Sequence, residues 1–145
     1  MPRLIRSLLC KRVITDRETN DVTYVDCVES LMPKRLPAPL PQLYLATLWK
    51  SDESGEQPRL RVAIVGPGSH KPYHHEFPPI IIKPEHKSHR ININLQGAPI
   101  NQHGEHHIRV EVRPQEAKRW TRVAEIPLEV VEAPQDGNES AETQA

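Results

Sequence analysis

The chain has 145 residues, which is enough for one domain with a hydrophobic core of its own. Its 19 Lys and Arg balance its 19 Asp and Glu, but the segment 125–145 holds six of the acids and no base, so the rest of the chain carries an excess of six positive charges. That excess is spread thinly, no run of Lys or Arg exceeds two, and the six aromatic residues are scattered, which argues against a nucleic-acid-binding surface.

Membrane insertion and secretion are also disfavoured. The first 13 residues, MPRLIRSLLCKRV, are interrupted by Arg6 and Lys11, so they contain no apolar signal-peptide core. No apolar run approaches the length of about 18 residues that a membrane span needs. We therefore expect a soluble, cytoplasmic protein without a membrane partner.

Short apolar and β-branched runs follow one another along the chain, separated by Pro, Gly, Asn and Asp. The 15 prolines leave little room for long helices. We expect an all-β domain over residues 1–132, a single antiparallel β-sandwich of about eight strands, followed by a disordered acidic C-terminal tail over 133–145. The strands are expected near 4–15, 22–31, 43–50, 59–65, 77–82, 89–95, 106–113 and 120–131.

The first two of these strands should form a hairpin. LLCKRVITD and VTYVDCVE flank the connection RETN, whose Asn20 tolerates a left-handed conformation. Pairing Asp16 with Asp21 sets Cys10 directly opposite Cys27. Opposed residues of an antiparallel pair lie about 4.5–5.5 Å apart at Cα, within disulfide range, yet in a reducing cytoplasm both thiols would pack as small hydrophobic groups. The sequence leaves open which of the two holds.

A proline-rich stretch, MPKRLPAPLPQLYL, comes next and should be extended. Its prolines are spaced by four, two and two residues, so it contains no PxxP ligand motif. We interpret it as a stiff crossover that carries the chain from one sheet to the other. Farther on, GPGSHKP at 66–72 lacks the spacing of a phosphate-binding loop and should be a turn.

The histidines are the most suggestive chemical feature. All eight lie between positions 70 and 107: His70, His74, His75, His86, His89, His103, His106 and His107. In HHIRVEV the apolar set is every second residue, so His106 should face the core and His107 the solvent, and the two cannot chelate one ion from a regular strand. If 89–95 folds back against 106–112, His89 lies about 20 Å from His106, which excludes a metal shared between them.

A metal site from several loops stays possible at this stage. His103 and His106 could close over His74 or His75, with Glu76 or Glu105 as a carboxylate ligand. A pH response is a related alternative, because imidazoles titrate near pH 6.5.

Catalysis is harder to build from these spacings. The pairs Ser69–His70 and Ser88–His89 are sequence neighbours that point apart on an extended chain, and no His lies near Cys10 or Cys27 in sequence. We therefore expect no enzymatic activity, and we assign no catalytic, cofactor-binding or metal-binding residue and no cofactor.

Five segments carry a family likeness: LLCKRVITDRETNDVTYVDCVE, LPAPLPQLYLATLW, RVAIVGPGS, LQGAPINQHGEHHIRVEV and AEIPLEVV. Together they resemble a family of small, mostly-β bacterial proteins of unknown function, with a Cys near the first strand and a proline-rich bend after the second. The likeness covers most of residues 8–131. One departure is His106, where the resemblance implies an aromatic residue such as Tyr. The resemblance implies the fold and no mechanism.

The function that these features favour is a non-enzymatic binding or assembly module acting through protein–protein contacts, with a protein partner or a second copy of the chain (a homodimer) at a sheet edge or loop end. The alternative is a metal- or pH-responsive protein that uses the histidines of 70–107.

Overall fold

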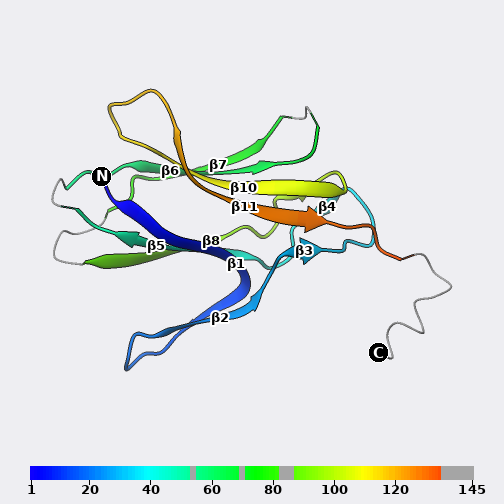
Figure 1. The fold of residues 1–145 in the computed structure, drawn as a ribbon, viewed down its shortest axis with the longest axis horizontal. Helices are drawn as coiled ribbons and strands as arrows, with labels where there is room; N and C mark the ends of the chain where they lie inside the picture. Colours follow the sequence, from blue (N-terminus) through cyan, green and yellow to red (C-terminus); the bar gives the residue numbers. More distant parts are fainter. Residues whose placement is uncertain (53–54, 69–70, 82–86, 135–145) are drawn as a thin grey trace.

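The computed structural model describes residues 1–52, 55–68, 71–81 and 87–134. Within these ranges the chain forms eleven strands and no helix (Figure 1). The strands are β1 (Arg3–Thr15), β2 (Val22–Cys27), β3 (Ser30–Leu31), β4 (Ala38–Pro39), β5 (Tyr44–Lys50), β6 (Arg59–Val65), β7 (Tyr73–Phe77), β8 (Ser88–Asn94), β9 (Pro99–Ile100), β10 (Gly104–Arg113) and β11 (Thr121–Val130).

The described strands form three sheets. Sheet A has the order β2-β1-β5-β8, sheet B has the order β3-β11-β10-β6-β7, and β4 pairs with β9 in a third, two-stranded sheet. All pairings are antiparallel except that of β3 with β11. The all-β class is confirmed. Three sheets and eleven described strands take the place of the single eight-stranded sandwich that we expected, because short strands at the end of the domain were not visible in the hydrophobic pattern.

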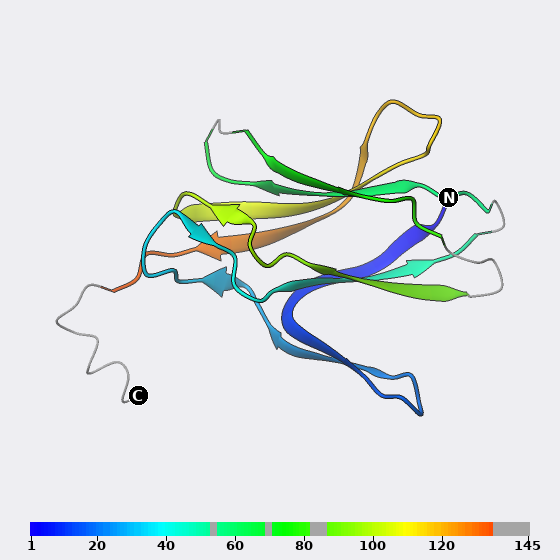
Figure 2. The ribbon, with the colours of Figure 1, turned by 180° about the vertical axis from the view of Figure 1, so that it is seen from behind.

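One hydrophobic core joins sheets A and B, which form two facing layers in Figure 1 and Figure 2. Sheet A contributes the row Leu9, Leu45 and Ile93, paired across three neighbouring strands and all buried. Sheet B contributes alternate residues of β10, among them Val110, and their partners on β6 and β11. Because period-2 alternation puts every second side chain inside, the outer face of sheet B is left for polar groups.

The β1–β2 hairpin has the expected register. Cys10 is paired with Cys27, and Asn20 has a φ of 63° in the connecting turn. Asp16 shapes that turn, since its carboxylate accepts hydrogen bonds from the amides of Glu18 (2.8 Å) and Thr19 (3.0 Å), which lower the pKa of Asp16. The prediction of Cys10 opposite Cys27 is therefore confirmed.

The far half of this hairpin folds back under sheet A, on the side away from sheet B (Figures 1 and 2). Arg90 on β8 donates to the side chain of Asn20 at the hairpin tip (3.3 Å), and the Arg6 guanidinium lies over the Tyr24 ring, 5.6 Å from its centre. Ala46 points outward from sheet A and is nevertheless only 2% exposed. The hairpin thus adds cover to a face that would otherwise meet solvent.

The segment 22–31, expected as one strand, is two strands in different sheets. β2 ends at Cys27 in sheet A, and β3 begins at Ser30 in sheet B, so the chain changes sheet at residues 28–29. The proline-rich segment after β3 then leads back from sheet B to β5 in sheet A. It connects the two sheets as predicted, and it contains β4, which belongs to the third sheet.

The prediction of a strand at 77–82 is wrong for residues 78–81, which the structure describes and which form no strand. Its apolar run FPPII contains two adjacent prolines, which cannot donate to a ladder, and only Ile80 is buried, with its amide bonded to the Pro58 carbonyl (2.7 Å). The strand at this point is β7, Tyr73–Phe77, whose mostly exposed residues YHHEF lack the alternation we relied on. Position 82 lies outside the described residues.

The folding of 89–95 against 106–112 is also wrong. β8 pairs with β5 in sheet A, whereas β10 lies between β6 and β11 in sheet B. The short sheet β4–β9 intervenes, because Pro99 and Ile100 pair with Pro39 and Ala38 before β10 begins. His89 and His106 consequently lie in opposite sheets.

Candidate functional site

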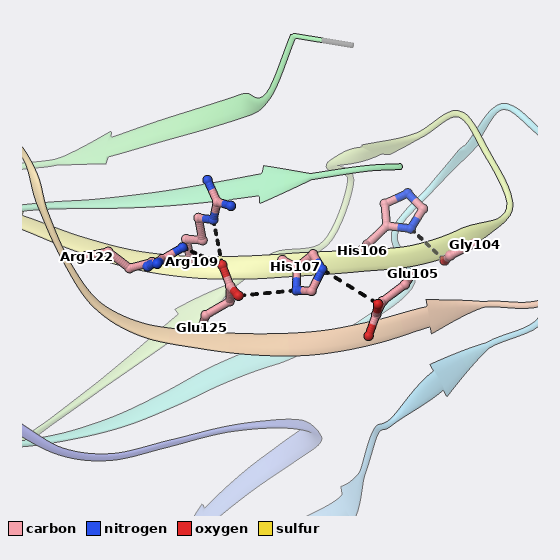
Figure 3. Close-up of polar contacts among 7 residues, drawn as sticks. All are labelled: Gly104, Glu105, His106, His107, Arg109, Arg122 and Glu125. Atoms are coloured by element: carbon pink, nitrogen blue, oxygen red, sulfur yellow. Dashed lines mark hydrogen bonds and ion pairs between the residues drawn. The ribbon is translucent and has the colours of Figure 1, made fainter. Parts of the chain in front are cut away.

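Polar side chains gather at the start of β10 and on the adjoining part of β11, on both faces of sheet B (Figure 3). On the outer face Glu125 is the centre of a network. Its carboxylate accepts hydrogen bonds from Arg109 Nε (2.7 Å) and Arg122 Nη1 (2.8 Å), and His107 Nδ1 lies 3.5 Å from it. Figure 3 shows His107 between Glu125 and Glu105, whose oxygen is 3.9 Å from His107 Nε2.

This network keeps Glu125 ionised. The hydrogen bond from Arg109, together with the charges of Arg122 and His107, lowers the pKa of Glu125 against a smaller opposing effect of desolvation. His107 Nδ1 lies near this carboxylate but makes no well-directed hydrogen bond to it among the described residues. A carboxylate held in its charged form is a poor proton donor, and the exposed network is better suited to joining β10 to β11 than to acid catalysis.

His106 lies on the opposite face, inside the domain. It is 3% exposed, as its place in the alternation predicted. Its Nδ1 is 3.0 Å from the carbonyl oxygen of Gly104, so Nδ1 donates to that oxygen, and in the neutral imidazole Nε2 then presents a lone pair. Gly104 has a φ of 115°, and a Cβ at that position would lie 3.1 Å from Pro67 Cγ, so the strand begins at a residue that only glycine suits.

A hollow of about 270 Å³ adjoins His106. It lies where the ends of β6 and β10 meet the segment before β7 and the loop after β9. Its lining is Ile64, Gly66, Lys71, Pro72, Tyr73, Pro99, Asn101, Gln102 and His106. A buried imidazole beside a small hollow that also has amide and ammonium groups in its lining is an arrangement that can bind a small molecule.

The structure does not gather the histidines into a metal centre. His74 and His75 are exposed on β7, and His103 is exposed before β10. His89 is half-buried opposite Trp49 in sheet A, and the positions of His70 and His86 lie outside the described residues. Across residues 1–52, 55–68, 71–81 and 87–134, no three His, Cys, Asp or Glu side chains are placed to hold one metal ion.

A larger and more apolar hollow, of about 640 Å³, lies at the other side of this end of the domain, beside the proline-rich segment. β3, β4, β9 and the end of β11 all contribute to it. Its lining is Lys11, Val28, Leu31, Met32, Pro33, Lys34, Arg35, Ala38, Pro39, Leu40, Pro41, Gln42, Leu43, Ile100 and Val130. Met32 is 56% exposed, and the part of the lining that the structure describes includes three cationic side chains and no acidic one.

Arginines gather around Trp120 at the far end of sheet B. The guanidinium carbons of Arg61 and Arg113 lie 4.4 Å and 5.2 Å from the centre of the Trp120 ring. Arg61 also pairs with Glu111 (2.9 Å). Arg113 is directly opposite Arg59, and the Nε atoms of both are buried without a hydrogen-bond partner. Opposed like charges weaken a strand pair, and stacking on the indole offsets part of that cost.

The two cysteines are free, Cys10 fully buried and Cys27 exposed. Burial raises the pKa of the Cys10 thiol, and the nearby Cys27 adds to the effect. A thiol with a raised pKa forms little thiolate, so the structure gives no support to Cys10 as a nucleophile.

Sequence reasoning singled out His103, His106, Glu105 and the β7 histidines, and of these His106 lines the hollow of about 270 Å³. It missed Lys71, Asn101 and Gln102, because single polar residues in loops carry no pattern. It also missed Met32. This apolar residue lies between Leu31 and Pro33, and we interpreted it only as part of the proline-rich crossover.

The described residues thus define an all-β domain of layered sheets, with two hollows at one end and no grouped metal ligands. No described segment is a helix of the length and apolar character that crossing a bilayer requires. The chain belongs to a family of unknown function, DUF6941, whose model matches residues 6–130. No curated protein and no solved structure matches the chain.

Proposed function

We propose that this chain is a non-enzymatic binding module that docks another protein in the apolar hollow beside its proline-rich segment. The observation that carries this proposal is the combination of apolar lining and unbalanced charge. Leu40, Ile100 and Val130 form the buried floor of the hollow, Leu31 is half-buried, and Met32 stands 56% exposed beside them. An exposed apolar side chain at the edge of an apolar hollow is typical of a contact site.

The charge of the lining indicates the class of partner. Lys11, Lys34 and Arg35 belong to the hollow, and among the described residues its lining contains no Asp or Glu. An extended acidic segment with an apolar side chain would satisfy both features, since the apolar group can fill the hollow while its carboxylates meet the three cations. Methionine at the centre of such a surface adapts its shape to its partner.

The prolines make the hollow ready to bind. Pro33, Pro39 and Pro41 line it and have their φ angles fixed by the ring. The amide of Leu40 is bonded to the Ala98 carbonyl (2.7 Å), and the amide of Gly97 to the Leu40 carbonyl (2.9 Å), which ties this segment to the loop before β9. A wall that is already ordered loses little entropy when a ligand docks.

A peptide library tests this proposal. Random peptides displayed on phage are selected on the full chain, and the enriched peptides are synthesised and measured by fluorescence anisotropy. We expect acidic peptides with an apolar residue, and a loss of affinity of about tenfold or more in Met32→Asp and in the double variant Lys34→Glu/Arg35→Glu. Ile14→Asp, which changes a 45% exposed side chain outside the lining, is the matched control.

Peptides that bind Met32→Asp as tightly as the wild type would overturn the proposal. A chain that lacks 135–145 is measured in parallel, because those residues include three acids and could compete with the peptide. Light scattering after size exclusion covers the remaining alternative, a second copy of this chain. A dimer that Met32→Asp dissociates would replace the foreign partner with a self-contact.

A further inference from the structure

The small hollow at His106 carries an inference that is independent of the proposed protein docking. His106 is a polar side chain that is 3% exposed, and its one hydrogen bond among the described residues joins Nδ1 to the Gly104 carbonyl at 3.0 Å. Figure 3 shows the other ring nitrogen pointing away from Gly104 and from the strand that carries it. No hydrogen bond from the described residues reaches Nε2, and His106 lines the hollow, so a ligand in the hollow can bond to this nitrogen.

The hollow can supply the place for that partner. Gly66 lies in its lining, and a Cβ built on Gly66 would be 3.3 Å from His106 Nε2 and 3.9 Å from Gln102 Oε1. The space in front of the nitrogen therefore exists because residue 66 has no side chain.

The remaining polar groups of the lining indicate the ligand's charge. Lys71 contributes a cation, Tyr73 a hydroxyl, and Asn101 and Gln102 two amides, and no acidic residue of the described ranges belongs to the lining. One ammonium with several neutral donors suits an oxyanion. In the neutral imidazole the bond at Nδ1 leaves His106 Nε2 as an acceptor, and a hydroxyl group on the same ligand supplies the donor that it needs.

The volume limits the ligand's size. At about 270 Å³ the hollow lies just below the range of about 300–1,000 Å³ usual for ligand sites. We therefore propose that the His106 hollow binds a small oxyanion that carries a hydroxyl group, with Lys71 facing the negative charge and His106 Nε2 accepting from the hydroxyl. Hydrogen phosphate and the carboxylate of a small hydroxy acid both have this chemistry.

Nuclear magnetic resonance of the ¹⁵N-labelled full chain tests the site and separates these two sources. Sodium phosphate, sodium lactate and sodium acetate are titrated separately, with sodium chloride at matched ionic strength as the reference. We expect saturable shifts at the amides of Gly66 and Gln102 and at the His106 imidazole with phosphate or with lactate, at millimolar concentrations or below. The anion that saturates first identifies the source, and acetate, which lacks the hydroxyl, should bind about tenfold more weakly.

Substitutions at Gly66, Lys71 and His106 test whether the anion binds in this hollow. Gly66→Ala places a methyl group 3.3 Å from Nε2 and should lower affinity by about tenfold or more. Lys71→Met should also lower it, whereas Lys118→Met, which makes the same charge change outside the lining, should leave it unchanged. His106→Asn keeps a donor for the Gly104 carbonyl and removes the ε nitrogen, so it should fold and fail to bind.

Two results would overturn the inference. One is the absence of a saturable shift with either hydroxylated anion up to tens of millimolar, on the order of the weakest specific binding. The other is an equal loss in Lys71→Met and Lys118→Met, which would reduce the effect to overall charge. Because Lys71 is exposed, its variant tests the site even where Gly66→Ala or His106→Asn disturbs the fold.

Discussion

A buried polar chain in sheet A gives the sharpest stability prediction. Trp49 Nε1 donates to Thr47 Oγ1 (2.8 Å), and that hydroxyl donates to the Ile91 carbonyl (2.5 Å). Thr47 is 1% and Trp49 0% exposed. The change Thr47→Val keeps the shape of the side chain but leaves the indole N–H without an acceptor in the core.

The expected cost follows from that orphaned donor. Leaving a buried N–H without a partner lowers the free energy of unfolding by about 1–3 kcal/mol. For a chain of this size that corresponds to a fall in Tm of roughly 3–9 °C. Thr47→Ser, which keeps the hydroxyl and loses one methyl, should cost about 0.8 kcal/mol. Urea unfolding followed by circular dichroism measures both, since the signal does not depend on either tryptophan.

A double-mutant cycle with Trp49→Phe isolates the hydrogen bond. In the Trp49→Phe background no indole N–H is left to orphan at this position, so Thr47→Val should cost less there than in the wild type. An equal cost of Thr47→Val in the two backgrounds, or a cost below that of Thr47→Ser, would refute the reasoning.

Three further predictions concern the hairpin and β10. Iodoacetamide should label Cys27 of the folded chain and reach Cys10 only on unfolding, because Cys10 is 0% exposed and burial raises its pKa; mass spectrometry of the two peptides decides this. Because the pKa of Glu125 is lowered in the folded state, its contribution to stability is present above its ordinary value of 4.5 and is lost as the pH falls through the folded value, so Glu125→Gln should shift the urea midpoint downward at neutral pH and leave it unchanged in strong acid. Gly104→Ala should destabilise by about 1–3 kcal/mol, since φ is 115° there and a Cβ would lie 3.1 Å from Pro67 Cγ; a thermal melt equal to the wild type's would contradict this.

The parts of the fold that sequence reasoning reached are those set by local chemistry. The turn at Asn20 fixes the β1–β2 register, and the alternation of β10 places His106 inside and His107 outside. The parts of the fold that the sequence did not predict depend on pairing between strands that are far apart in the chain. β7 is an edge strand with exposed residues and no apolar period, and β8 is paired with β5 although β10 is nearer in sequence.

The candidate sites follow the same division. His106 was visible because a histidine on an apolar face breaks a pattern. The large hollow was not, because Leu31, Ile100 and Val130 meet only through the pairing of β3 with β11 and of β4 with β9. Two-residue strands leave no periodic trace in a sequence, yet they decide which surfaces come together.

The strand order has a consequence for how the chain acquires its structure during synthesis. β5 needs β8 and β6 needs β10, while β3, near the beginning of the chain, is held by β11 through residues 129 and 130. A growing polypeptide can close the β1–β2 hairpin early, but sheet B cannot be completed until its last strand has left the ribosome. Until then the apolar faces of β5 and β6 stay uncovered, and the nascent chain depends on chaperones or on rapid late closure to avoid aggregation.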